Sequence, residues 1–471
     1  MQTLYKISYL FLLLFIASSC TDELINKNPT DEASPETLFE TEGGFRSALD
    51  GVYGAMKEDF LGYNFCILSI PEAINDDVIA GDPMGFTFEG THADIYPLDY
   101  DPTEFQLEGF WKIAYEAINN ANTIIKYGNG SPLKSKDRYI AEALAQRALL
   151  HYDLYRFFAP AYNQSKDALA IPYRFENDAL LAEKARNTNA EVIEWIIKDL
   201  ELAIEMADNE ENSYRLSKTA MQALLARICL ETQQYDKAIL NAKEALKDTR
   251  YGLDMDEQAL TNQWRQDESD EIIFRIRFDV ADKGYNAAVL AIPVYFSFPY
   301  YVSDDLINLY DQANDLRFNL FFEQDPMGSG AYYPEKHVGM RTADYDAFNP
   351  GSIDVKYIRV PELYLILAEA SERNQDGIDH TEARNNLNAL RNARGLGDFS
   401  GTDAELLDEI MDERRRELAF EGFRFTDLKR LGQGFTRPDG SGLEANHGRF
   451  ALPIPKLEID RSGIEQNPAY K

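Results

Sequence analysis

Hydrophobic residues recur at helical spacing over most of this chain, and that periodicity constrains its fold more than any other feature. In residues 42–61, Phe45, Leu49, Val52 and Met56 follow one another at intervals of three or four, which places them on one face of a helix. The same periodicity predicts further helices over residues 105–127, 136–158, 190–207, 217–232, 235–247, 359–373, 381–394 and 404–420. The sequence therefore predicts a mainly α fold, with long irregular loops and a few short strands between the helices.

Small residues occur at a regular interval in two pairs of these helices. Ala226, Ala238 and Ala245 are separated by twelve and then seven residues, and a weaker copy of the same intervals begins at Ser371. Tetratricopeptide repeats have small residues at these intervals, because two antiparallel helices approach closely there. We therefore expect a tetratricopeptide-like helical repeat scaffold.

Two long segments interrupt the helical pattern, residues 62–103 and 248–356. Both are rich in aromatic residues, and within the second, residues 271–278 read as a strand. A long irregular segment inside a compact domain is usually functional. We expect these insertions to carry a binding surface.

The residue types in the insertions suit a sugar ligand. Aromatic rings pack against the apolar C–H faces of sugars, and Asp, Asn and Arg bind the hydroxyl groups. The alternative is that these rings fill small cores under their own loops, since aromatic side chains are often buried. The candidate ligand-binding residues are Asp77, Phe86, Phe88, Tyr96, Tyr285, Phe298, Tyr300 and Tyr301.

The first twenty residues have the order of an export signal. Lys6 precedes an apolar run at residues 9–16, which is too short to span a bilayer, and small residues at 17–19 lead to Cys20. A Cys at the cleavage point is typical of a bacterial lipobox. Cleavage before Cys20 and acylation of its thiol would anchor the protein to a membrane without spanning it. The alternative is an ordinary secretory signal with an incidental Cys.

The rest of the chain is predicted to form a tether and one domain. Residues 1–19 are the signal peptide, and residues 20–40 are polar, as expected for a tether. Residues 41–471 form a single domain with ligand-facing insertions at about 62–103 and 248–356.

Composition excludes some partners and leaves others open. The net charge of −33 makes nucleic acid an unlikely ligand and mildly disfavours anionic polysaccharides. Cys66 and Cys229 are far apart in sequence, which does not show whether they pair, and the helical surroundings of Cys229 favour a buried free thiol. Acidic pairs such as Asp76-Asp77 and Asp304-Asp305 match no defined calcium loop, so we expect no metal or other cofactor.

One acidic cluster is a candidate catalytic site. Glu413, Glu417 and Glu421 share a helical face at intervals of four, and paired carboxylates can hydrolyse glycosides. Basic residues 414–416 lie beside them, so an ion-pair network is the simpler interpretation, and we expect no enzyme activity. Gly422 is expected to end this helix.

Motifs along nearly the whole chain resemble the SusD/RagB family of outer-membrane nutrient-binding lipoproteins. The most specific is the run at 413–424, E-R-R-R-E-L-A-F-E-G-F-R. In chain order, the matching segments are residues 43–53, Trp111 with Tyr115, Ile118, Ala121 and Asn122, residues 142–152, the E-I-I-F strand at 271–274, residues 309–317, Arg359 with Glu362, Tyr364 and Leu365, and residues 387–391, 413–424 and 453–470. Chance would not place so many motifs in collinear order.

The resemblance implies a SusD-like fold and a role at the cell surface. A family member holds a glycan, or in some cases a peptide, and delivers it to a SusC-like TonB-dependent outer-membrane transporter without making or breaking a bond. The repeat helices would form one face of the scaffold, and the insertions would face the ligand. Asp22 and Glu23, which follow Cys20 and Thr21, resemble the surface-export signal of Bacteroidetes lipoproteins. The rival interpretations are a glycoside hydrolase and a pure protein-interaction scaffold.

Overall fold

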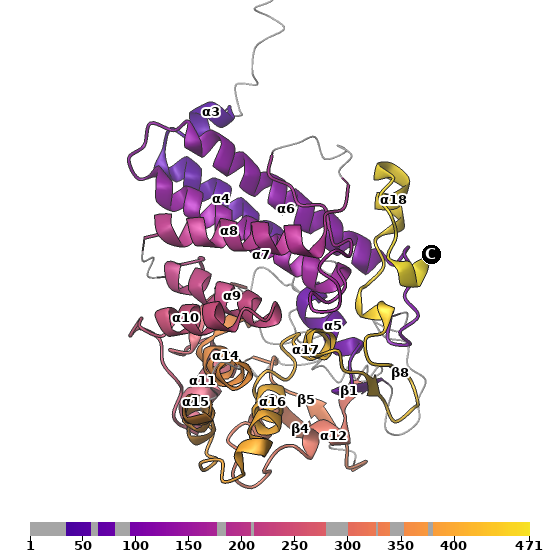
Figure 1. Ribbon diagram of the computed structural model, residues 1–471. Helices are drawn as coiled ribbons and strands as arrows, with labels where there is room; N and C mark the ends of the chain where they lie inside the picture. The colour runs from indigo at the N-terminus through magenta and orange to yellow at the C-terminus, as the bar shows by residue number, and fades with distance from the viewer. Residues whose placement is uncertain are drawn as a thin grey trace, which may run out of the picture.

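The computed structural model describes residues 34–57, 65–80, 95–176, 185–208, 212–278, 300–325, 328–339, 353–374 and 380–471 (Figure 1). The predicted signal peptide, Cys20 and most of the tether lie outside these residues, as do Phe86, Phe88, Tyr285 and Phe298.

Helices dominate the described part of the chain. The N-terminal half contains α3 (Pro35–Leu38), α4 (Glu42–Met56), one π-helical turn (Phe65–Ser69), α5 (Ile70–Ala73), α6 (Phe105–Asn129), α7 (Lys136–Phe158) and α8 (Asn189–Met206). The remaining helices are α9 (Lys218–Glu231), α10 (Tyr235–Ala245), α11 (Glu257–Gln266), α12 (Asp304–Ile307), α13 (Phe318–Phe321), α14 (Val360–Arg373), α15 (His380–Ala393), α16 (Leu406–Glu417), α17 (Arg424–Leu431) and α18 (Lys456–Ser462).

The repeat scaffold forms as the small-residue intervals predict. Helix α9 packs on α10, α10 packs on α14, and α14 packs on α15 and α16, while α4, α6, α7 and α8 stack above them (Figure 1). Ala226, Ala238 and Ala245 are all fully buried, which lets the helix backbones approach closely. The mainly α, repeat-based prediction is confirmed.

Some helix boundaries differ from those predicted. Helix α4 ends at Met56, before the predicted residue 61, and α16 ends at Glu417 instead of 420. The prediction that Gly422 ends α16 is wrong: Phe420 already has a left-handed φ of 65°, so the chain leaves the helix before it reaches Gly422. The insertion at 248–356, predicted as irregular, contains α11, which Asp256 caps through a hydrogen bond to the Ala259 N–H.

The described strands form four antiparallel pairs. They are β1 (Val78–Ala80) with β3 (Tyr300–Val302), β2 (Ile272–Ile276) with β6 (Val355–Arg359), β4 (Phe322–Gln324) with β5 (Tyr332–Pro334), and β7 (Phe435–Thr436) with β8 (Gly442–Leu443). The predicted strand at 271–278 is β2.

Of the four hydrophobic clusters in the described residues, the two largest support these elements. The larger joins the N-terminal helices to the repeat scaffold. The smaller lies under β1 and β3 and includes Trp264, Tyr300 and Phe321. Cys66 and Cys229 are both buried free thiols, so they do not pair with each other, and the prediction for Cys229 is confirmed. Across the described ranges, no helix is long and apolar enough to cross a membrane.

Candidate functional site

The two aromatic-rich insertions meet at one short strand pair. Strand β1 comes from the first insertion and β3 from the second, and their register pairs Val78 with Val302, Ile79 with Tyr301 and Ala80 with Tyr300. Residues 81–94 continue the chain directly from β1, and residues 279–299 lead directly into β3. We call this strand pair, with the side chains around it, the loop junction.

The register of β3 sends its two tyrosines to opposite faces, because side chains alternate along a strand. Tyr300 is 1% exposed and packs in the smaller core, with its ring centroid 6.0 Å from that of Tyr96. Tyr301 is half-buried, on the face opposite to Tyr300. Of the described candidates, Tyr301 therefore has the ring most accessible to a ligand, while Tyr96 and Tyr300 support the junction from below.

Asp77 is fixed at the start of β1 by an arginine from the C-terminal signature motif. Its carboxylate accepts one hydrogen bond, from Arg415 Nε at 2.7 Å, and its backbone carbonyl accepts the Ser303 N–H at 2.9 Å. The neighbouring Asp76 accepts two hydrogen bonds from Arg424, at 2.7 and 2.8 Å. These pairs tie the first insertion to the scaffold.

The two adjacent carboxyl groups differ in their electrostatics. Burial raises the pKa of Asp77, and Arg415 offsets only part of that rise. Burial acts in the same direction on Asp76, but the hydrogen bonds and charges of Arg424 and Arg415 lower its pKa overall. Asp76 therefore loses its proton at a lower pH than Asp77 does.

A polar cleft of about 280 Å³ borders Asp77. Its wall contains carboxylates, guanidinium groups and the ring of Phe423. Burial raises the pKa of the half-buried Asp412 carboxyl in this wall. Such a wall can both donate hydrogen bonds to hydroxyl groups and accept them. The charged residues that line the cleft are Asp77, Asp408, Asp412, Arg414, Arg415, Arg424 and Asp427.

Arg437 joins the two ends of the first insertion, a role that the sequence did not predict. Its guanidinium lies 3.9 Å from the centroid of the Tyr96 ring and donates hydrogen bonds to the carbonyls of Ala73, Asn75 and Tyr96 at 2.6 to 2.9 Å. A single Arg in a turn sequence carries no signal that would identify this role. Arg415 and Arg424, in contrast, lie in the signature motif.

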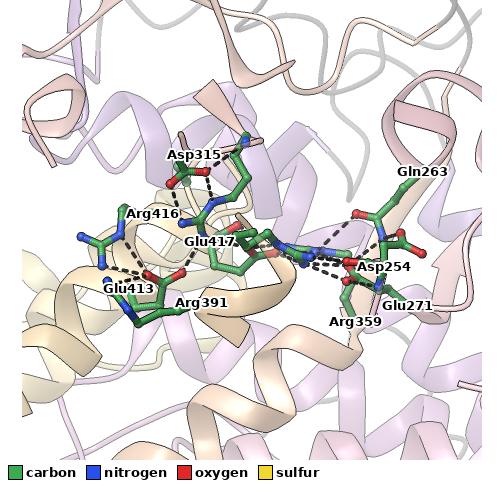
Figure 2. Close-up of polar contacts among 12 residues, drawn as sticks. Asp254, Gln263, Glu271, Asp315, Arg359, Arg391, Glu413, Arg416 and Glu417 are labelled. Atoms are coloured by element: carbon green, nitrogen blue, oxygen red, sulfur yellow. Dashed lines mark hydrogen bonds and ion pairs between the residues drawn. The ribbon is translucent and has the colours of Figure 1, made fainter. Parts of the chain in front are cut away.

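Glu413 and Glu417 of α16 belong to a buried ion-pair network, as expected (Figure 2), but Glu421 lies beyond the end of α16, so the three do not share one helical face; Glu421 accepts hydrogen bonds from Lys336 and Arg359. Glu417 accepts hydrogen bonds from Arg317, Arg359 and Arg394 at 2.9 to 3.1 Å, and Glu413 accepts from Arg317 at 2.7 Å. All three arginines come from segments of the chain outside α16. Of the three basic residues beside the cluster in sequence, Arg416 alone bonds to one of its carboxylates in the described contacts, at Glu413.

This network does not offer an acid for catalysis. Burial would raise the pKa of each carboxyl, but the arginines outweigh it, holding the pKa of Glu413 at about 2 and that of Glu417 well below its usual range. A glycosidase needs one carboxyl with a raised pKa facing its substrate. The cluster therefore acts as structural support.

Within the described ranges, no group of three or more His, Cys, Asp or Glu side chains could hold a metal ion. Asp76 and Asp77 are paired with arginines, and Asp304 and Asp305 lie in the first turn of α12.

Two family models match the chain. One is described as the SusD family and matches residues 326–470, and the other is described as starch-binding associating with outer membrane and matches residues 45–230. SusD-like protein P2 of Formosa agariphila is 27% identical, and the alignment covers 99% of each chain.

Solved structures share the fold. A SusD superfamily protein from Bacteroides thetaiotaomicron is similar with a TM-score of 0.80 and 26% identity, over 90% of this chain and 99% of the other. A SusD-like carbohydrate binding protein from Bacteroides vulgatus is similar with a TM-score of 0.76 and 22% identity, over 89% of this chain and 96% of the other.

Proposed function

This chain belongs to the SusD/RagB family, and from that premise we propose that it captures a glycan at the loop junction and delivers it to a SusC-like TonB-dependent transporter. The observation that carries the proposal is the β1–β3 register, which joins two aromatic-rich insertions from distant parts of the sequence. The description of one matching model as starch-binding supports a glycan over a peptide. No bond of the glycan is made or broken.

The loop junction suits the two surfaces of a sugar. The half-buried Tyr301 offers a ring to an apolar C–H face, and the polar cleft beside Asp77 offers donors and acceptors to hydroxyl groups. Phe86, Phe88, Tyr285 and Phe298 belong to the segments that leave and enter this strand pair, so they are proposed to extend the same surface. Tyr96 and Tyr300 are proposed to hold that surface in place.

The location proposed for the protein follows from its N-terminus. Cys20 would carry the lipid that anchors the mature protein to the outer membrane, with the domain exposed at the cell surface. Residues 20–40 are proposed to link this lipid to the domain.

Calorimetric titration tests the binding role. The soluble form, starting after Thr21, is titrated with maltohexaose, cellohexaose, laminarihexaose and xylohexaose, and reducing-end release is assayed on the same samples. We expect saturable binding of one hexasaccharide without turnover. Tyr301→Ala should weaken that binding about tenfold or more, the usual effect of losing a central aromatic contact. Tyr162→Ala, which removes another half-buried tyrosine, is the matched control.

Each alternative gives a different result. Turnover of any saccharide would contradict the proposed absence of catalysis. Binding of a peptide library with no saccharide binding would identify the peptide-binding type of the family. Purification of the lipidated protein from detergent-solubilised outer membranes tests the partner, and recovery without a TonB-dependent barrel would contradict the proposed delivery role.

A further inference from the structure

A second cleft lies between α6 and the C-terminal helix α18, which stands at the edge of the molecule (Figure 1). Its volume is about 460 Å³, larger than the cleft at the loop junction. Side chains from α6, from Pro172 and Arg174, from Pro455 and from α18 itself line it. Neither β1 nor β3 contributes to it, so it is distinct from the loop junction.

The floor of this cleft is apolar and fixed. Trp111 and Tyr115 of α6 are 4% and 8% exposed and pack together with ring centroids 5.0 Å apart, and the Arg174 guanidinium lies 5.3 Å from the Tyr115 ring centroid, so only the edges of the two rings reach the cleft. The Tyr115 hydroxyl donates a hydrogen bond to the Pro172 carbonyl at 2.7 Å, which locks the ring in place. Pro455 and Leu457 complete the apolar lining. A rigid floor of this kind loses little conformational entropy when a ligand binds.

The rim of the cleft is charged but balanced. Three carboxylates and three cations surround the apolar floor, so the local charge sums to zero in a chain of net charge −33. Along α6 the charges follow one another at one-turn spacing, and the nitrogen of Lys112 lies 3.8 Å from a carboxylate oxygen of Glu116. The charged rim residues are Glu108, Lys112, Glu116, Arg174, Glu458 and Arg461.

We propose that the α6–α18 cleft is a second binding site, for a neutral saccharide. Sugars join apolar C–H faces to hydroxyl groups that both donate and accept hydrogen bonds, which matches an aromatic floor inside a rim of donors and acceptors. The balanced rim charge favours a neutral sugar over an anionic one. The proposal rests on the proposed function for the class of ligand, but not for the site.

A proline-rich peptide fits this cleft less well. Aromatic grooves that bind such peptides use ring-borne donors for the peptide carbonyls, and the Tyr115 hydroxyl already donates to Pro172. The rim carboxylates can accept further hydrogen bonds, although Glu116 already pairs with Lys112 and Glu458 accepts one from the Ser462 hydroxyl at 2.7 Å. Sugar hydroxyls supply donors, whereas the proline nitrogen of a peptide has none.

The cleft stays open because the C-terminal segment does not fill it. Helix α18 has no buried residue. Its Leu457 is half-buried and forms part of the cleft lining. Protein interiors are normally close-packed, so space of this size beside fixed aromatic rings is available for a ligand.

Two substitutions on α18 test the proposal. Leu457→Trp puts a bulky ring into the cleft, and Lys456→Trp puts the same ring on the neighbouring exposed position, which does not line it. Because no residue of α18 is buried, both variants should fold, and circular dichroism checks this. Each is titrated calorimetrically with the same four hexasaccharides and with decaproline, beside the wild type and Tyr301→Ala.

We expect Leu457→Trp to weaken one hexasaccharide site about tenfold or more, while Lys456→Trp binds like the wild type. Loss of binding in Leu457→Trp with none in Tyr301→Ala would support the cleft and overturn the loop junction. The reverse result would support the junction and overturn the cleft. Three further results would also overturn the cleft proposal. They are equal hexasaccharide affinity in all variants, absence of hexasaccharide binding, and binding of decaproline alone.

Discussion

At the scale of single residues, buried charge is the main structural device of this chain. Arg317, Arg359 and Arg394 come from three separate segments and converge on Glu417, so one carboxylate ties distant parts of the sequence together (Figure 2). A buried ion pair adds little net stability over an apolar pair of equal volume, but the removal of one partner leaves charge uncompensated. The network therefore fixes the arrangement of these segments.

Glu417→Gln should lower the free energy of unfolding by about 3–5 kcal/mol, because it leaves three buried guanidinium groups without their shared anion. Guanidinium chloride denaturation measures the change. Glu194→Gln, which removes an exposed partner of Lys198, is the control and should change stability little. Similar losses of unfolding free energy in both variants would show that the buried network contributes no more to stability than an exposed ion pair.

The raised pKa of Glu72 predicts that the protein loses stability as the pH rises. Burial, and then the nearby Asp77, raise its pKa to about 8, although it accepts hydrogen bonds from Gly422 N–H and Asn75 at 2.8 Å. Between about pH 5 and 8 the folded protein holds a proton that the unfolded chain releases. Raising the pH over that range therefore lowers the free energy of unfolding, by up to about 1.4 kcal/mol per pH unit.

Glu72→Gln should remove this contribution, because the amide keeps the shape of the neutral carboxyl and does not titrate. The measurement is denaturant unfolding of both proteins across that pH range. The variant should gain stability relative to the wild type as the pH rises. Parallel stability profiles would mean that Glu72 does not hold its proton in the folded state.

At the scale of elements, the sequence predicts the helices better than their ends. The intervals of Ala226, Ala238 and Ala245 follow from close helix packing, which any antiparallel helix pair of this type requires. The end of α16 depends instead on the left-handed Phe420, and no local sequence rule favours that conformation for a phenylalanine. Tertiary contacts override the local signal there.

The same distinction applies to the loop junction. The sequence identifies two aromatic insertions, but the register of β3 decides that Tyr300 is buried and Tyr301 is not. A shift of one residue would exchange their faces, and adjacent tyrosines carry no pattern that fixes it. Arg437 could not be predicted either, because its partners are backbone carbonyls, which have no sequence signature.

Gly422 tests how the signature motif packs against the first insertion. It has a φ of 77°, and a Cβ there would lie 2.1 Å from the Ile67 carbonyl oxygen. Gly422→Ala should therefore lower the free energy of unfolding by at least about 2 kcal/mol. Gly54→Ala, at an exposed position of α4, is the control: a Cβ there meets nothing within 4 Å, and the substitution should stabilise the protein by about 0.5–1 kcal/mol. Thermal and denaturant unfolding should agree on these opposite signs; a neutral Gly422→Ala would show that the backbone at Ile67 can yield.

At the scale of the whole molecule, the fold brings together the parts that we propose to face the ligand. Within the repeats, helices that are neighbours in sequence pair with each other, as α9 does with α10 and α14 with α15, whereas the loop junction and the α6–α18 cleft each combine segments from distant parts of the sequence. This explains why the fold class could be predicted from periodicity while the exact ligand contacts could not. A single sequence shows residue types, but not which distant segments meet.

Net charge gives a last prediction that depends on no single contact. With a charge of −33, the protein repels an anionic glycan until the ligand is close to its site, whereas a neutral glycan experiences no such force. Hexagalacturonate should therefore bind more weakly than the neutral hexasaccharide that binds best. Its affinity should rise about threefold or more between about 0.02 and 0.2 M salt, because salt screens the repulsion, and the neutral affinity should stay constant. Calorimetry at both salt concentrations measures this. Tighter binding of hexagalacturonate at low salt would instead mean that a local basic surface outweighs the charge of the whole molecule, and the ligand class would then be an acidic glycan.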